Sequence, residues 1–407
     1  KNDLKNNDFF NKTYSKHFRL LETDLLKNLK TVNPVLLCFS HYENEDEISI
    51  ITKYNDSLFN GVKIDSTSFF SKLIDSIYIA STSKNIIDKL QPNPHSDFEE
   101  LLQTTSTNAS FSIYLDNKSI DSLGHAMFNQ KTKTHSLMLD QSETSGELNL
   151  NGIAISNELK PQLLNIFSRT TPQENTLSNI APSDSNGFIS FTFNNYDILK
   201  ANIEHYTTQK IDSTINDFWL HSINEIGEIY LENSSIIVAK SLDPTTTKDG
   251  LLEHQDIVTT FREVNILQFN TPQFFKTIFS PLLSDRDLNV YANMDNYFVF
   301  ANSESDLQTI IANYQNSATL SKNQALLNGY SNISDESSLL LVADSDKLEN
   351  ITSKIFNLNS SPINLSDYKF STFQFVQDED FMHVNININK NKSRAVSNTI
   401  SDEFNIT

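Results

Sequence analysis

Glycine is scarce in this sequence, and its scarcity excludes several kinds of site. Only eight glycines occur among the 407 residues, and no two of them stand at G-x-G spacing. Loops that cradle phosphate need clustered glycines, because backbone N–H groups must approach the phosphate oxygens closely. The G-x-S-x-G turn that presents a nucleophilic serine is missing as well. The sequence therefore predicts neither a nucleotide site nor a serine hydrolase of that type.

Cysteine and tryptophan each occur once, and the histidines do not form pairs. Cys38 stands in the apolar run 34–39 and has no second cysteine to join in a disulfide or zinc site, so we expect a small buried side chain. Trp219 is expected in a core or an interface, since a sugar-binding surface would display several aromatic rings. None of the nine histidines stands in the H-x-H or H-E-x-x-H spacing that directs two imidazoles at one metal.

Basic residues and long apolar runs are also in short supply. The formal net charge is −20, which repels phosphate backbones and anionic membranes, so no nucleic acid is expected as a partner. The acidity is interpreted as a solvated surface. No apolar run approaches the roughly 20 residues of a membrane helix. Membrane contact is therefore expected only through an anchor that would lie upstream of Lys1.

Two spacings that could indicate catalysis or metal binding have simpler interpretations. The S-x-x-K spacing of acylating enzymes occurs at Ser81–Lys84 and Ser366–Lys369, but Ser81 falls where a helix cap is expected. Residues 285–289 begin like a calcium loop, but the loop's sixth and twelfth positions lack the required glycine and glutamate. Other acidic clusters stand at 43–47, 344–346 and 378–380. The sequence does not exclude the paired carboxylates of a glycosidase, because the two residues of such a pair meet in space and need not be close in sequence. We predict no catalytic, cofactor-binding or metal-binding residue.

Two distant parts of the chain repeat the same order of elements. Residues 77–87 and 298–308 each read as an apolar strand ending in alanine, a cap rich in serine or asparagine, and a helical period. Further matches follow in order: short helices at 97–102 and 324–327, strands at 111–116 and 339–344, helix starts at 118–123 and 346–351, and hairpins at 136–155 and 370–388. Before them, 66–73 matches 271–278, 48–52 matches 236–240, and 3–7 matches 198–202. We interpret this order as an internal duplication.

The duplication predicts an α+β protein of two modules, each a mainly antiparallel sheet with helices on one face. A mixed sheet with parallel crossovers is the alternative. We place the first module at 1–158, a linker with a short helix at 159–186, the second module at 187–392, and a polar tail at 393–407. The second module opens with strand 188–193, which has no counterpart in the first. We therefore expect the first module's opening strand upstream of Lys1.

The opening Ile180-Ala181-Pro182 with strand 187–191, and the later strand and cap 297–303 with its helix, resemble a bacterial protein family. That family consists of uncharacterised extracytoplasmic proteins and is classed as a domain of unknown function. The heavy use of Asn, Lys, Ile and Phe resembles its Bacteroidota members, which are often lipoproteins. The resemblance implies a place in the periplasm or at the outer membrane, and it supplies no catalytic residue.

These observations lead to three hypotheses about function. The first is a non-catalytic protein-interaction or scaffold module of the cell envelope, an accessory of outer-membrane machinery whose partners are other envelope proteins. The second is a module that binds glycan or peptidoglycan, and the third is a hydrolase that depends on carboxylates or a metal. The first hypothesis is preferred, because duplication offers broad sheet faces and strand edges to partners.

Overall fold

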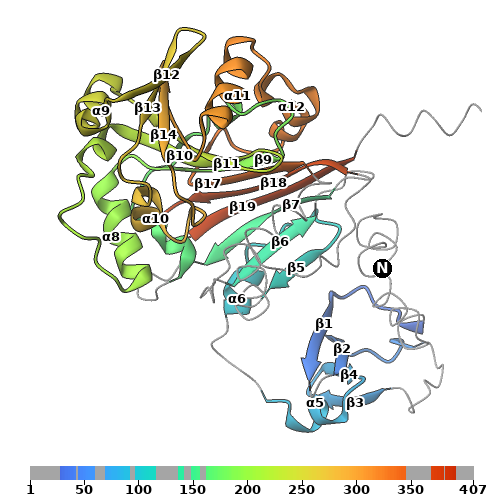
Figure 1. The fold of residues 1–407 in the computed structure, drawn as a ribbon. Coiled ribbons are helices and arrows are strands. Elements are labelled where there is room, and N and C mark those ends of the chain that lie inside the picture. Colours follow the sequence, from blue (N-terminus) through green and yellow to red (C-terminus); the bar gives the residue numbers. More distant parts are fainter. Residues whose placement is uncertain are drawn as a thin grey trace, which may run out of the picture. The chain divides into compact units, whose positions relative to one another are not determined.

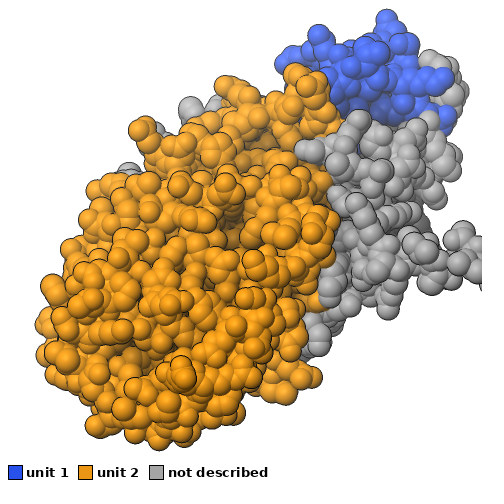
Figure 2. Space-filling model, turned by 90° about the horizontal axis from the view of Figure 1, so that it is seen from above, with its two compact units in different colours: residues 1–96 blue, residues 97–407 orange. Residues whose placement is uncertain are grey.

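The computed structural model of this protein describes residues 28–42, 45–59, 69–91, 97–115, 136–141, 148–155, 162–344, 368–379 and 381–390. The matches expected at 3–7, 118–123 and 346–351 and the tail at 393–407 lie outside these residues. The chain divides into two compact units, residues 1–96 and 97–407, which Figure 2 colours separately. The predicted module boundaries at 158 and 187 do not coincide with this division, and as sequence modules they stay a prediction.

The first unit holds a four-stranded sheet in the order β1-β2-β4-β3, in which every neighbouring pair is antiparallel. Its elements are β1 (Val35–Tyr42), β2 (Glu45–Lys53), β3 (Phe70–Ile74), β4 (Ile77–Ser81) and the helix α5 (Lys84–Lys89). One face of the sheet carries a small core of Ile50, Phe69 and Ala80, against which Leu37 and Tyr78 pack. Alternate residues of β2 and β4 point to the other face, which is described below.

The second unit is built on a sheet of 13 described strands, whose neighbours all pair antiparallel. In spatial order they are β12 (Ile257–Phe261), β13 (Val264–Gln268), β14 (Val290–Met294), β15 (Tyr297–Ala301), β11 (Ser235–Ser241), β10 (Ile223–Tyr230), β9 (Gly187–Thr192), β17 (Leu339–Asp344), β18 (Tyr368–Gln377), β19 (Phe381–Lys390), β7 (Leu148–Ile155), β6 (Leu137–Gln141) and β5 (Ser112–Leu115). Figure 1 shows the strands from β17 to β5 lying side by side. The α+β prediction is confirmed. The alternative with parallel crossovers is wrong for the described strands.

Short helices and a small second ladder are the other described elements of the unit. The α-helices are α6 (Asp97–Leu102), α8 (Tyr196–Thr207), α9 (Pro244–Gly250), α10 (Phe274–Phe279), α11 (Glu304–Gln315) and α12 (Gln324–Tyr330). The 3-10 helices are η1 (Leu163–Phe167), η2 (Leu177–Asn179), η3 (Phe218–Ser222), η4 (Leu252–His254) and η5 (Leu320–Lys322), and β8 (Gln173–Glu174) pairs with β16 (Glu336–Ser337). Among the described residues, no helix is both long and apolar enough to cross a membrane.

Helices contact both faces of the sheet around β15, where one face was expected. The ring of Phe300 lies 4.7 Å from that of Phe275 in α10, measured between centroids. Its neighbour Val299 points to the opposite face and is buried in one cluster with Leu307 and Ile310 of α11. Because β15 is buried at all five positions, it has no wet face and reads as a continuous apolar run.

Two groups of strands share one order, β1-β2-β4-β3 in the first unit and β10-β11-β15-β14 in the second. In each group the last hairpin turns at an aspartate with a φ of 52°, Asp75 or Asp295. Eight residues later each chain starts a helix at a serine N-cap, Ser83 or Ser303. When the two groups are aligned on these turns and caps, Ile77 corresponds to Tyr297. The match made on sequence paired Ile77 with Phe298, one residue further along.

One further match made on sequence fails because the two segments form different elements. The match of 66–73 with 271–278 is wrong, because Phe70 begins strand β3 whereas Phe274 begins helix α10. The linker at 159–186 stays a prediction: within it Leu177, Ile180 and Ala181 are fully buried in one cluster with residues of β9 and β10, whereas Arg169, Glu174 and Asp184 are exposed. A turn does form at 182–185, where the Ser185 N–H donates to the Pro182 carbonyl at 3.0 Å.

Candidate functional site

The serine–lysine spacing at Ser81 is part of a helix start. The Ser81 hydroxyl is fully buried and accepts hydrogen bonds from the Ser49 hydroxyl at 2.8 Å and the Ser83 N–H at 3.1 Å. Lys84 is exposed to solvent at the first turn of α5. The two side chains therefore do not form a nucleophile and its base. Ser366 of the second such spacing lies outside the described residues.

The suspected calcium loop is held by ion pairs within the protein. The Asp285 carboxylate lies 2.6 Å from Lys276 Nζ, and the Asp287 carbonyl accepts from the Asn302 side chain at 3.0 Å. Throughout the described ranges, no group of three or more His, Cys, Asp or Glu side chains is arranged to hold a metal ion. The clusters at 43–47, 344–346 and 378–380 are only partly described; Asp378 caps its own turn by accepting from the Glu379 N–H at 2.8 Å.

Trp219 lies in the core, as expected. Only 1% of its surface is exposed, and its ring stacks on those of Phe274 and Phe300 at centroid distances of 5.4 and 5.9 Å. Aromatic pairs at these separations add stability beyond the area they bury. The single tryptophan thus reports on the packing of α10 against β15, and it offers no face to a sugar.

Two buried glutamates of β10 escaped the sequence analysis, and the first holds the chain that leads into β9. Glu225 is fully buried, and its carboxylate accepts from the Thr176 N–H at 2.8 and 3.0 Å and from the Leu177 N–H at 3.2 Å. The hydroxyls of Thr176 and Ser190 donate to it as well, at 2.6 and 2.7 Å. Burial raises the pKa of Glu225. Because these donors satisfy the buried carboxylate, it fixes the start of η2.

The second glutamate, Glu228, holds a loop in the same manner. It is 1% exposed and accepts from the Ser284 N–H at 3.1 Å and the Ser284 hydroxyl at 2.6 Å. The Ser235 hydroxyl also donates to it, and Arg286 Nε lies 3.6 Å away. These contacts hold the loop at Ser284 against β10. The signal in the sequence is a pair of glutamates within the otherwise apolar strand Ile223–Tyr230.

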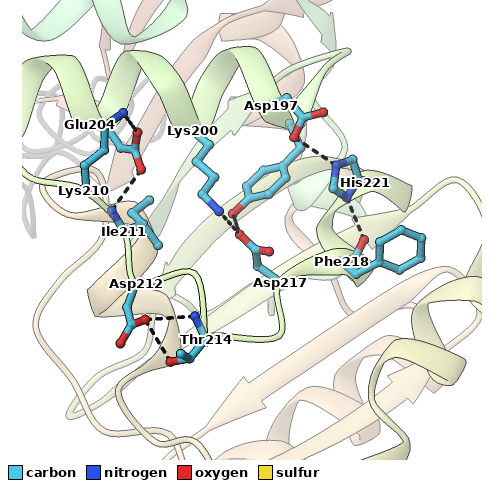
Figure 3. A network of polar contacts seen from close by, with 11 residues as sticks. Asp197, Lys200, Glu204, Lys210, Ile211, Asp212, Thr214, Asp217, Phe218 and His221 are labelled. Atoms are coloured by element: carbon cyan, nitrogen blue, oxygen red, sulfur yellow. Dashed lines mark hydrogen bonds and ion pairs between the residues drawn. The ribbon is translucent and has the colours of Figure 1, made fainter.

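A polar network lies where α8 meets η3 (Figure 3). Asp217 accepts from Lys200 Nζ and from the Tyr196 hydroxyl, both at 2.6 Å. Partial burial acts to raise the pKa of Asp217, but the hydrogen bonds from Lys200 and Tyr196 hold it below its usual value. His221 bridges the Asp197 carboxylate at 3.1 Å and the Phe218 carbonyl at 2.9 Å. Every one of these groups already has a protein partner, so the network fastens α8 to η3.

The first unit contains an apolar pocket that these internal contacts do not fill. It has a volume of about 300 Å³ and lies on the face of the sheet opposite the small core. Its lining consists of two serines together with the apolar side chains of Cys38, Ile51, Ile79, Ile86 and Leu90. Cys38, which was expected to be a small buried side chain, is half-buried here, and burial raises the pKa of its thiol.

The pocket adjoins β1, the end strand of its sheet. All eight residues of β1 pair with β2 in one continuous register, from Val35 opposite Thr52 to Tyr42 opposite Glu45. The strand contains no Lys, Arg, Asp, Glu or Pro, and Val35 is 40% exposed. An antiparallel strand directs half of its N–H and C=O groups away from its partner. We regard the outer side of β1 and the adjoining pocket as the candidate site; its sequence signal is the uncharged run 35–42.

Comparison with known proteins assigns no function to this site. No family model matches the chain, and a search of curated proteins also found no match. The resemblance to extracytoplasmic Bacteroidota proteins therefore stays a prediction.

Proposed function

We propose that this chain is a non-catalytic protein-interaction module of the bacterial cell envelope, acting through an exposed strand edge. The observation that carries the proposal is the outer side of β1, which is regular, uncharged and next to an apolar pocket. Exposed edges of this kind pair with other chains unless charges, prolines or bulges prevent it. Main-chain hydrogen bonds then provide affinity, and side-chain pockets provide specificity.

The chemistry of the second unit supports a scaffold role. Its buried carboxylates, Glu225 and Glu228, hold loops through backbone and hydroxyl donors, and its surface network joins α8 to η3. Asp285 of the suspected calcium loop is paired with Lys276. The polar groups that might have suggested an enzyme thus have structural partners, and the candidate site is apolar.

The proposal includes an origin by internal duplication. It is supported by the common strand order, by the positive-φ turns at Asp75 and Asp295, and by the serine caps eight residues beyond them. The meanders β5-β6-β7 and β17-β18-β19 extend the parallel, since each is a run of three sequential antiparallel strands. In this interpretation, the second copy has both edges of its four-stranded group β10-β11-β15-β14 covered by further strands, β9 and β13.

Purification from the native envelope tests the function. We expect the protein to fractionate with the cell envelope and to be recovered with a partner at fixed stoichiometry, which native mass measurement would record. Val35→Lys, which puts a charge on the exposed edge, should release that partner. Val32→Lys is the matched control, because Val32 is fully exposed and lies before the strand. Recovery in the cytoplasmic fraction, or only as a free monomer, would contradict the proposal.

A further inference from the structure

A stripe of polar side chains crosses one face of the large sheet. Residues directly opposite each other in an antiparallel pair point to the same face. On the neighbouring strands β18, β19, β7, β6 and β5 (Figure 1), one such row consists of Gln374, Asn385, Asn151, Asp140 and Ser112. Gln374 is fully buried, Asn385 is partly exposed and Ser112 is exposed. The stripe therefore leads from a covered part of the sheet to the surface.

The next row on the same face holds two buried side chains with unpaired polar atoms. Two residues away along the strands, Thr372 stands opposite Asn387, and both are 0% exposed. The Thr372 hydroxyl and both polar atoms of the Asn387 amide, Oδ1 and Nδ2, have no hydrogen-bond partner among the described residues. Side chains opposite each other have Cβ atoms about 4.5–5.5 Å apart, which is close enough for a bond between them. Since they do not bond to each other, both are available to a third group.

The first row shows how this sheet pairs a buried amide. Gln374 Oε1 accepts from the Asn385 side chain at 2.8 Å and from the Ser334 N–H at 3.0 Å, and Gln374 Nε2 donates to the Ser334 carbonyl at 2.6 Å. A buried polar group without a partner loses its hydration and gains nothing in return. Three such atoms side by side, next to a fully paired amide, indicate a place for a polar ligand.

The three unpaired atoms restrict the chemistry of that ligand. The Asn387 amide needs a donor for Oδ1 and an acceptor for Nδ2, and the Thr372 hydroxyl can serve as either. An ionised carboxylate has only acceptors and an ammonium group has only donors, whereas a hydroxyl has both. The nearest polar side chains on β18, β19 and β7 are uncharged as well, and they are Gln374, Asn385, Asn149 and Asn151. The site therefore suits a neutral ligand that carries hydroxyl groups.

A sugar fits these atoms better than a peptide does. A peptide unit also has one donor and one acceptor, but its N–H and C=O point in opposite directions in the trans form, so one unit cannot meet both atoms of the Asn387 amide. Two hydroxyls on adjacent carbons of a sugar can each rotate, and together they can serve Oδ1 and Nδ2. Further along the same face of β19 stand His383, which is exposed, and Phe381, with ring centroids 5.1 Å apart. A longer glycan that follows β19 would reach these rings.

We infer that the face of β18 and β19 at Asn387 binds a neutral sugar, whose hydroxyl groups pair with the Asn387 amide and the Thr372 hydroxyl. The inference goes beyond the proposed function, because the site lies in the second unit and does not depend on the edge of β1. Both side chains are enclosed in the free chain. Binding therefore displaces the atoms that cover them, and the sugar supplies the hydrogen bonds that the enclosed groups lack.

An array of neutral and acidic glycans, probed with the labelled full chain, tests the inference. We expect binding to neutral glycans, and at least tenfold weaker binding to counterparts in which hydroxymethyl groups are oxidised to carboxylates. Calorimetry then compares the best glycan with its free monosaccharide. Equal affinities identify the free sugar as the ligand, and at least tenfold tighter binding of the glycan identifies the polymer.

Two variants keep the size of the side chains and remove their polar atoms, Thr372→Val and Asn387→Leu. Each should weaken sugar binding at least tenfold. Each should also raise the urea midpoint of the sugar-free chain, followed by Trp219 fluorescence, because an unpaired buried group is removed. Thr260→Val is the matched control at an exposed position of β12 and should change neither quantity.

Three results would overturn the inference. The first is a wild-type chain that binds no neutral glycan or monosaccharide, or that binds peptides in their place. The second is sugar binding that both variants retain. The third is a lower urea midpoint for both variants, which would show that these groups are already paired in the free chain by a trapped water only. None of these results bears on the co-purification experiment with Val35→Lys, so the proposed function is tested separately.

Discussion

Glu225 offers the sharpest test of the reasoning about buried charge. Glu225→Ala removes the acceptor of two backbone N–H groups, those of Thr176 and Leu177, and of two hydroxyls. The hydroxyls can rotate to other acceptors, but the amides cannot. Each buried donor left without a partner costs about 1–3 kcal/mol. Removing the charge also removes its desolvation cost, so we expect a net loss of about 4 kcal/mol in the free energy of unfolding.

Urea denaturation followed by the fluorescence of Trp219 measures this loss, because the indole is buried in the same unit. Glu225→Gln keeps one oxygen for the amides and should cost about 1–2 kcal/mol. Glu232→Ala, at an exposed position just beyond β10, should stay within about 0.5 kcal/mol of the wild type. A free energy of unfolding of Glu225→Ala that lies within about 1 kcal/mol of the wild-type value would refute this role of the carboxylate.

The pH dependence of the same variants provides an independent check. Because burial raises the pKa of Glu225 in the folded state above its unfolded value, the native protein takes up a proton as the pH falls. The stability of the wild type relative to Glu225→Gln is then largest below the unfolded pKa and decreases as the pH rises through the folded value. A relative stability that instead grows with rising pH would contradict burial as the dominant influence.

Three further predictions concern other contacts of the second unit. Gly187→Ala should destabilise by about 3 kcal/mol or more in urea, because φ is 129° and a Cβ would lie 2.1 Å from the Val342 carbonyl oxygen. His254 should titrate below 6.5 by NMR, since burial lowers its pKa; its contribution to stability is present above pH 6.5 and is lost as the pH falls through the folded value. Asp217→Asn should cost about 1 kcal/mol by weakening the Lys200 contact, and unchanged urea midpoints would refute the importance of this pair.

Local patterns were enough to place many elements. The helix expected at 97–102 is α6 with the same bounds, and the strand expected at 339–344 is β17. The alternation of apolar residues with asparagine at 384–389 does lie in a strand, β19, but Asn387 is as fully buried as Val384, so the side expected to face solvent is covered at that position. These segments carry their own period or cap, so little depends on distant parts of the chain.

Features decided by tertiary contacts could not be found in the same way. The Phe-Phe pairs at 69–70 and 274–275 look alike, but the second lies in a helix covered by aromatic rings. A match displaced by one residue moves every side chain of a strand to the other face, so the sequence match of Ile77 with Phe298, in place of Tyr297, compared side chains on opposite faces. The candidate edge itself depends on which strand ends the sheet, and this is set by pairing across the fold.

The position of β7 has a consequence for the synthesis of this protein. Its neighbour β19 follows much later in the chain: Ile155 pairs with Phe381, which is 226 positions further on. At about 5–20 residues per second, a ribosome needs roughly 10–45 seconds to supply that neighbour. During this interval one side of Leu148–Ile155, whose leucines are buried in the finished sheet, stays without a partner. The nascent chain should therefore depend on chaperones most strongly between the emergence of these two strands.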